Sequence, residues 1–295
     1  RPPTQPPPPP PPQQPPGQPP PLPPQKQAPP SAATLATFAA SLSALAKTPP
    51  PAVPTPAAPA TRAGPTSFKL LGRERNPNGH ADSVLSLGFS PAEPRMLASA
   101  GRDGTARLWD VERAVCTSIL RGHTEAVRMV LWDPANTKRL TTLSSDRTVK
   151  HWDTSQAREL ATVVSGEAEN LFGAWAPDGS FLAVGNANNG LSLVDARAGK
   201  VSKTSKFAYD VNELAWFTRD RLGVATAYNR LGFIEVLDAS ADLQRIAAFQ
   251  AHTATCYGLK RSSDGAKFAT SGLDGTVALW RARDATCYRN IERLD

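Results

Sequence analysis

Acidic residues are absent from the start of the chain, and proline is scarce in the rest of it. Residues 1–65 contain no Asp or Glu but hold 25 of the 30 prolines, which leaves five prolines in the remaining 230 residues. The formal charge of +7 therefore divides into +4 on the first segment and +3 on the second. Such a small charge on the second segment excludes a strongly basic folded domain, so direct binding of nucleic acid is not indicated.

Cysteines and long apolar runs are also scarce. The three cysteines, Cys116, Cys256 and Cys287, form no Cys-x-x-Cys pair, which argues against a disulfide framework and favours a reducing compartment. No apolar run approaches the roughly 18–20 residues that a membrane-spanning helix needs. Glycine-rich phosphate loops and Gly-x-Ser-x-Gly motifs are missing as well, so no enzyme class and no cofactor are indicated. Because the sequence begins with Arg1, we expect it to be part of a longer protein.

Residues 1–66 are expected to be a disordered tail, because a Pro- and Gln-rich chain lacks both backbone donors and apolar side chains. The segment 31–47 differs, since it has no proline and places Leu35, Phe38, Leu42 and Leu45 at helical spacing. Two interpretations stay open for it: a short helix that docks on another surface, or an Ala/Ser-rich linker that is only transiently helical.

A period of about 43 residues runs through the rest of the sequence. Trp109-Asp110 and Trp152-Asp153 are 43 residues apart, and Trp280 falls on the same series. A Gly-His or Ala-His pair precedes each of these tryptophans by 28 or 29 residues, as at His80 and His123. Repeats at a fixed period of this size are typical of modular folds. The sequence therefore predicts five units, at roughly 79–121, 122–165, 166–206, 207–249 and 250–295.

Each unit is predicted to contain four short strands. In the first unit, the runs Val84–Phe89, Met96–Ala100 and Thr105–Trp109 are separated by Pro-rich and Asp-Gly turns, and a fourth run centres on Cys116–Leu120. Four antiparallel strands per repeat form one blade of a β-propeller. The Gly-His and Trp-Asp series resembles the WD40 repeat. We therefore expect an all-β WD40 β-propeller over residues 67–295, preceded by the disordered tail.

The number of repeats raises the question of ring size. A seven-bladed ring at this period would need about 300 residues, whereas 230 residues hold five units. We expect a C-terminally truncated seven-bladed ring, with a five-bladed ring as the alternative. A propeller ring closes when a terminal strand completes the blade at the other end. Ser67–Leu71 would be that strand, with no sixth or seventh unit in the sequence for it to join.

Units one, two and five carry a His, a Ser or Thr, an Asp and a Trp in one register. The resemblance to WD40 proteins implies a chain of hydrogen bonds in which the turn aspartate orients the histidine, the histidine meets the hydroxyl, and the hydroxyl accepts the indole N–H. The residues are His80, Ser99, Asp103 and Trp109; His123, Thr142, Asp146 and Trp152; and His252, Thr270, Asp274 and Trp280.

These residues are interpreted as structural, since a buried polar network must be fully satisfied and then fixes strand geometry. With one histidine per unit, no zinc site is expected, and neither are catalytic, cofactor-binding or metal-ligating residues. Units three and four lack the set; unit three has Glu167, Val184 and Asn188 in its place. Either apolar packing alone or a partner holds those two units. His151 is interpreted as an exposed strand residue.

Units three to five resemble one particular WD40 family. Gly166–Asn186 (GEAENLFGAWAPDGSFLAVGN), Phe207–Trp216 (FAYDVNELAW) and Gln250–Asp295 are similar to the corresponding stretches of the THO complex subunit 3 family. The resemblance implies a non-catalytic scaffold in the nuclear THO/TREX assembly, which couples transcription to mRNA packaging and export. Other THO/TREX subunits would be the partners, RNA contact would be indirect, and neither a membrane nor a small-molecule substrate is implied. The sequence differs from the family in two places. Gly166–Asn170 has two more residues than the family's Gly-Glu-Asn, and the Pro-rich tail has no expected counterpart.

Two alternatives belong to other functional classes. Cullin-type ubiquitin-ligase receptors with WD40 repeats carry Trp-Asp-x-Arg, whereas here Asp110 and Asp153 are followed two residues later by Glu112 and Ser155. A splicing or chromatin adaptor is the second alternative. In any of these scaffolds, the residues just before the turn aspartates are expected to share one face. Arg102, Ser145 and Leu273 are therefore the candidate contacts with a partner.

Overall fold

The computed structural model of the chain describes residues 78–292, which form twenty β-strands arranged in five four-stranded antiparallel sheets. The predicted tail, the segment 31–47 and Ser67–Leu71 lie outside the described residues. The expected all-β fold with five four-stranded units is confirmed.

Each sheet, called a blade below, contains four consecutive strands. Blade one consists of β1 (Val84–Phe89), β2 (Met96–Gly101), β3 (Ala106–Asp110) and β4 (Val115–Leu120). Blade two consists of β5 (Val127–Trp132), β6 (Arg139–Ser144), β7 (Thr148–Asp153) and β8 (Arg158–Val164). Blade three consists of β9 (Asn170–Trp175), β10 (Phe181–Asn186), β11 (Gly190–Asp195) and β12 (Lys200–Lys206). Blade four consists of β13 (Asp210–Trp216), β14 (Arg221–Tyr228), β15 (Leu231–Asp238) and β16 (Gln244–His252). Blade five consists of β17 (Cys256–Arg261), β18 (Lys267–Gly272), β19 (Val277–Arg281) and β20 (Thr286–Ile291).

The strand positions follow the sequence pattern closely. In blade one, β1 has the predicted bounds, β2 is one residue longer, and β3 is shifted by one residue. Burial follows position in the sheet. The fourth strand β12 alternates between half-buried and exposed residues along KVSKTSK, whereas the second strand β10 is buried through its middle. A strand with one solvated face alternates in this way, and a strand covered on both faces does not.

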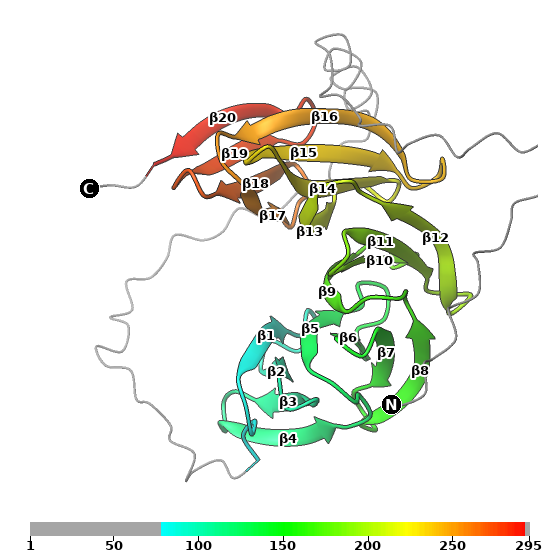
Figure 1. The fold of residues 1–295 in the computed structure, drawn as a ribbon. Coiled ribbons are helices and arrows are strands. Elements are labelled where there is room, and N and C mark those ends of the chain that lie inside the picture. The colour runs from blue at the N-terminus through cyan, green and yellow to red at the C-terminus, as the bar shows by residue number, and fades with distance from the viewer. Residues whose placement is uncertain (1–77, 293–295) are drawn as a thin grey trace, which may run out of the picture.

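The blades follow one another along an arc (Figure 1), in which β1, β5, β9, β13 and β17 contact each other in chain order. Apolar clusters fill the spaces between neighbouring sheets. Aromatic side chains also join neighbouring blades, because Trp132 Nε1 donates to Gly88 O and Trp216 Nε1 donates to Ala174 O, each at 2.9 Å. The first strands β5 and β13 are thereby attached to β1 and β9, the first strands of the preceding blades.

The arc has two ends that lie apart in Figure 1, at blade one and blade five. Phe89 occupies in β1 the position that Trp132 occupies in β5. It is 61% exposed, and Leu87 in the same strand is 62% exposed. This face of blade one is therefore apolar and uncovered by residues 78–292. The expected seven-bladed ring stays a prediction.

Candidate functional site

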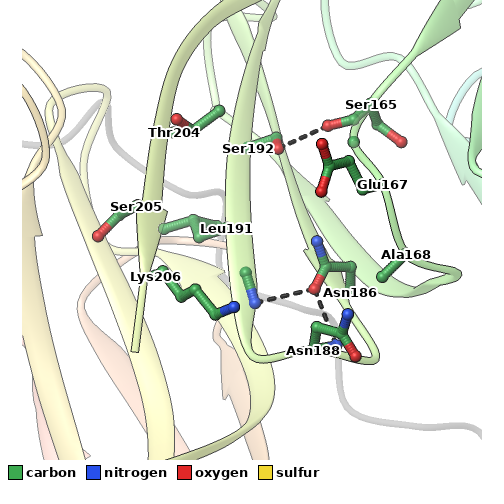
Figure 2. Close-up of a pocket in the computed structure, with 12 residues that line it drawn as sticks. Ser165, Glu167, Ala168, Asn186, Asn188, Leu191, Ser192, Thr204, Ser205 and Lys206 are labelled. Atoms are coloured by element: carbon green, nitrogen blue, oxygen red, sulfur yellow. Dashed lines mark hydrogen bonds between the residues drawn. The ribbon is translucent and has the colours of Figure 1, made fainter. Parts of the chain in front are cut away.

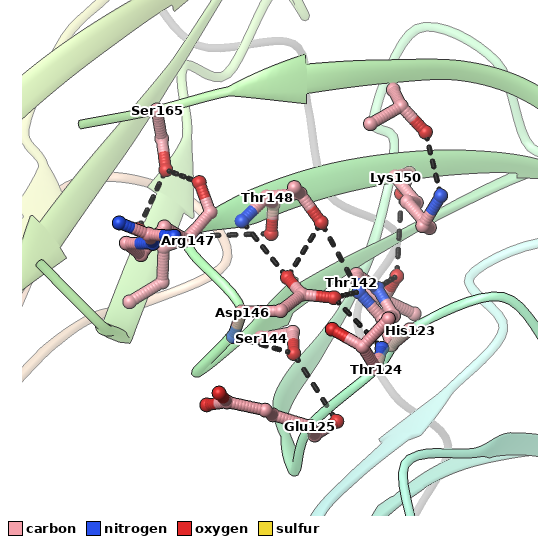
Figure 3. Close-up of polar contacts among 12 residues, drawn as sticks. His123, Thr124, Glu125, Thr142, Ser144, Asp146, Arg147, Thr148, Lys150 and Ser165 are labelled. Atoms are coloured by element: carbon pink, nitrogen blue, oxygen red, sulfur yellow. Dashed lines mark hydrogen bonds and ion pairs between the residues drawn. The ribbon is translucent and has the colours of Figure 1, made fainter. Parts of the chain in front are cut away.

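In blade two, the four recurring polar residues form a continuous chain of hydrogen bonds at one end of the sheet, and Figure 3 shows three of them, His123, Thr142 and Asp146. His123 Nδ1 lies 2.8 Å from Asp146 Oδ2, and His123 Nε2 lies 2.7 Å from Thr142 Oγ1. Trp152 Nε1 donates to the same Thr142 oxygen at 2.9 Å. The loop before β5, the turn between β6 and β7, and both of these strands are thus joined by side chains.

The direction of every bond in this chain follows from the groups that meet. An ionised Asp146 can only accept, so His123 Nδ1 carries the proton and donates. A neutral imidazole then has a bare Nε2, which accepts from the Thr142 hydroxyl. The Trp152 indole can only donate, so the Thr142 oxygen accepts from it. Each buried donor and acceptor in the chain is therefore paired.

The pKa values agree with this assignment. Burial raises the pKa of Asp146, but hydrogen bonds from the Thr148 hydroxyl, His123 and the Thr148 N–H outweigh burial and hold the pKa at about 2. Burial lowers the pKa of His123, and the neighbouring Asp146 opposes this only in part. A charged carboxylate and a neutral imidazole are thus the stable pair near neutral pH.

Blades one and five repeat the arrangement. His80 lies 3.0 Å from Asp103 and 2.7 Å from Ser99, and Trp109 donates to Ser99. His252 lies 3.1 Å from Asp274 and 2.8 Å from Thr270, and Trp280 donates to Thr270. The structure thus brings all twelve predicted network residues together in three separate sets of four, one set per blade, rather than in one cleft.

Blade four has a different polar cluster, which sequence reasoning missed. Tyr209 occupies the register of the histidine, and its hydroxyl donates to Glu235, which also pairs with Arg245. Glu235 is buried, and burial raises its pKa, with the Tyr209 and Arg245 contacts acting against the rise. The interval of 43 residues between Tyr209 and His252 could have identified the substitution. Apolar packing alone was one of the two interpretations left open for this blade. The Tyr209, Glu235 and Arg245 cluster shows that polar contacts also hold it.

Blade three has a polar pocket where blades one, two and five have the histidine. Asn186 Oδ1 accepts from the N–H groups of Asn188 and Gly190, so it caps the turn between β10 and β11. A pocket of about 420 Å³ opens beside this turn, between the loop at Ser165–Ala168 and the end of β12 (Figure 2). Glu167, which replaces the histidine, lines the pocket.

The three residues predicted to face a partner do not behave alike. Arg102 is exposed, and Leu273 is 65% exposed. The prediction for Ser145 is wrong, because this residue is only 6% exposed. Arg128 Nε donates to the Ser145 hydroxyl at 2.8 Å and covers it, while the Arg128 guanidinium continues to Glu169 in the next blade. At this position on the surface, the polar atoms that a partner could contact therefore belong to Arg128 and not to Ser145.

Two further interpretations of single residues are wrong. His151 is buried and lies 2.8 Å from the Thr141 hydroxyl, because its side chain points between blades two and three toward Trp175. Cys116 and Cys287 each lie seven residues after a tryptophan, and this shared position predicts small core residues. Cys287 is instead exposed, since β20 is exposed along its whole length. The equivalent Cys116 is half-buried.

Within residues 78–292, no three His, Cys, Asp or Glu side chains are grouped so that they could hold a metal ion. The same residues contain no helix that is long and apolar enough to cross a membrane.

Acidification from pH 6.5 to 4 is expected to lower the free energy of unfolding. Burial, followed by the Arg139 charge, lowers the pKa of His151 to about 4, and burial lowers that of His123. Unfolding restores the ordinary value of 6.5, so the unfolded state binds more protons throughout this window. His151 alone accounts for about 3 kcal/mol across it.

The measurement is the melting temperature across this pH range for the natural chain and for His151→Asn, which keeps a hydrogen-bonding group for Thr141. The variant should lose less stability on acidification. Glu235 acts in the opposite direction, because a raised pKa favours the folded state at lower pH. Glu235→Gln should therefore steepen the loss. Identical pH profiles for the natural chain and His151→Asn would contradict the assignment.

Five four-stranded antiparallel blades with recurring His, Asp and Trp residues define a WD40-repeat protein, and the comparison with protein families agrees. The family described as "WD domain, G-beta repeat" matches residues 73–110, 114–153 and 243–281. These matches cover strands of blades one, two and five, which carry the polar networks, and the third match also includes β16 of blade four. The family "Anaphase-promoting complex subunit 4 WD40 domain" matches residues 166–219 in blades three and four. The chain is a WD40-repeat protein, and proteins of this kind are generally non-catalytic scaffolds.

Among curated proteins, THO complex subunit 3 of Arabidopsis thaliana is 34% identical over 218 residues, which cover 74% of this chain and 54% of that protein. The WD repeat-containing protein AAC3 of Dictyostelium discoideum is 25% identical, over 72% of this chain and 36% of its own length. The chain thus spans about half of the first relative and about a third of the second. The solved WD40 domain of Toxoplasma gondii coronin has the same fold, with a TM-score of 0.66 at 18% identity over 73% of this chain and 60% of that one.

Proposed function

We propose that this chain is a scaffold subunit of the THO/TREX complex that acts in the nucleus in mRNP assembly and mRNA export. The observation that carries the proposal is the 34% identity, over 74% of the chain, with a protein named THO complex subunit 3. Two of the stretches that resemble the THO family, Gly166–Asn186 and Phe207–Trp216, lie in blades three and four. These are the blades in which Glu167 and Tyr209 replace the recurring histidine. Similarity at positions that depart from the general WD40 pattern supports a specific family rather than the fold alone.

The surface that would bind protein partners is the end of the blades that carries the turns between second and third strands. Arg102 and Leu273 project from this end, whereas Val111 lies in the turn at the opposite end of blade one. An exposed leucine at a turn is a side chain that a partner can cover. Contact with RNA is proposed to be indirect, since the residues after the tail carry a formal charge of only +3.

Affinity purification of the full tagged chain from nuclear extract tests the proposal. The other THO subunits should co-elute with the natural chain on size exclusion. Leu273→Glu should reduce their recovery severalfold, because it places a charge where an apolar contact is proposed. Val111→Glu provides the matched control at the opposite end and should leave recovery unchanged. Recovery of a cullin adaptor, or of splicing or chromatin proteins without THO subunits, would overturn the assignment.

A further inference from the structure

The pocket in blade three exists because three side chains that fill the same space in blade two are replaced. In blade two, this space holds His123, Thr148 and the buried side chain of Lys150. In blade three the corresponding residues are Glu167, Gly190 and Ser192. The imidazole, the hydroxyethyl side chain of threonine and a long cationic side chain are therefore absent together, and the space of about 420 Å³ takes their place. Pockets that hold ligands begin at about 300 Å³.

The walls of the pocket are fixed by hydrogen bonds. Asn186 Oδ1 accepts from Gly190 N at 2.8 Å and from Asn188 N at 3.0 Å. A Cβ atom on Gly190 would lie 2.5 Å from Asn186 Nδ2, so the glycine is required while this amide caps the turn. On the other wall, the Ser192 hydroxyl donates to Ser165 O at 2.7 Å. The pocket is therefore a built feature rather than a loosely packed region.

The polar groups that line the pocket match those that bind Lys150 in blade two. There, Lys150 Nζ donates to Glu159 at 2.9 Å and to the Thr162 hydroxyl at 2.7 Å. Thr204 occupies in blade three the position of Thr162, and it lines the pocket. The second oxygen ligand is supplied by Glu167, whose carboxylate is turned toward Ser192 in Figure 2. Within residues 78–292, this carboxylate has no hydrogen bond or ion pair, so its charge is available to a ligand.

Lys206 is the one cationic group among the lining residues. Its side chain comes from the end of β12 and is directed toward Asn186 in Figure 2, whereas Glu167 lies near Ser165 and Ser192. The negative and positive groups thus approach the pocket from different sides. A long side chain can place its charge at Glu167 while its methylene groups occupy the rest of the pocket.

We propose that the blade-three pocket binds a lysine or arginine side chain of a partner protein. The partner's cation takes the place that Lys150 fills from within blade two, with Glu167 and Thr204 as its oxygen ligands. This site is independent of the THO assignment, because any partner with a suitably exposed cation meets the same chemistry.

Binding of small probes to the full chain tests this proposal. N-acetyl-L-arginine methylamide and N-acetyl-L-lysine methylamide are expected to shift the backbone amide signals of Gly166 and Gly190 saturably in a ¹⁵N-labelled sample. Gly275, in the exposed turn of blade five, should not respond. Glu167→Gln should weaken binding about threefold to fivefold, the effect of one partly exposed ion pair. Lys206→Met should strengthen it, because a like charge is removed.

Neutral and acidic probes decide the outcome. Equal shifts with the neutral N-acetyl-L-norleucine methylamide would show that the pocket binds apolar side chains without regard to charge. Shifts with the glutamate analogue would show an anion site at Lys206. Either result overturns the proposal. The absence of shifts with both cationic probes also overturns it. Since Glu167 is exposed and has no partner among the described residues, Glu167→Gln should melt like the natural chain, so a lost signal cannot be attributed to unfolding. If the pocket does not bind the cationic probes, the expected co-elution with THO subunits still stands, because it does not depend on this pocket.

Discussion

Trp152→Ala is expected to lower the free energy of unfolding by about 3–5 kcal/mol. The indole is 2% exposed and packs with Leu120, Val127 and Leu140 between blades one and two. Truncation would remove this apolar contact area and leave a cavity that two adjoining sheets cannot close by small movements. Urea unfolding of the natural chain and the variant, monitored by circular dichroism, gives the difference.

Two variants separate packing from hydrogen bonding at this position. Trp152→Phe keeps much of the apolar ring but loses the donor to Thr142, so its cost should be smaller than that of the alanine variant. Trp109→Ala removes the equivalent residue of blade one, which is only half-buried, and should also cost less. If Trp109→Ala were as costly as Trp152→Ala, burial would not be the source of the effect.

Thr142→Val is expected to cost about 2–4 kcal/mol although it hardly changes the volume of the side chain. The Thr142 oxygen is fully buried and serves both His123 Nε2 and Trp152 Nε1. Valine would leave one buried acceptor and one buried donor unpaired, and each carries a desolvation penalty. Denaturant unfolding again provides the measurement.

Blade three supplies the matched control for this substitution. Val184 occupies the register of Thr142, next to Val194 instead of a tryptophan, and no histidine is present to be satisfied. Thr142→Ser retains the hydroxyl and should cost no more than about 1 kcal/mol. Val184→Thr should be destabilising, because it buries a hydroxyl that lacks the partners found in blade two. If Val184→Thr were stabilising, a hydroxyl at this position would be favourable even without the histidine and the tryptophan. That result would contradict the view that the hydroxyl needs both partners.

The sequence predicts features that repeat and fails at features that depend on neighbouring blades. Spacing places the histidines, hydroxyls, aspartates and tryptophans because each set lies within one unit. Ser145 and His151 could not be placed in this way. Arg128, which is paired with Glu169 of the next blade, covers Ser145, and Trp175 of the adjoining blade packs against His151. Burial at a boundary between two sheets depends on both sheets, and the period of one unit describes only one of them.

The candidate pocket was also beyond sequence reasoning, although its residues were noticed as departures from the repeat. Glu167 is visible as a missing histidine, but the space beside it depends on Gly190 and Ser192 as well. Only the structure shows that these small residues lie against the same loop. Tyr209 is the opposite case: the period locates it, and the structure adds its partner Glu235.

The order of strands within each sheet has a consequence for how the protein is made. Every hydrogen-bonded pair of strands joins neighbours in the chain, so a whole blade is complete once about 40 consecutive residues are present. Short loops close at low entropic cost and speed folding. Blade one can therefore assemble on the ribosome while blade two is still being translated. Each later sheet then condenses on one that is already complete, and in blades two and four a tryptophan of the first strand donates to a carbonyl, Gly88 O or Ala174 O, that is already in position.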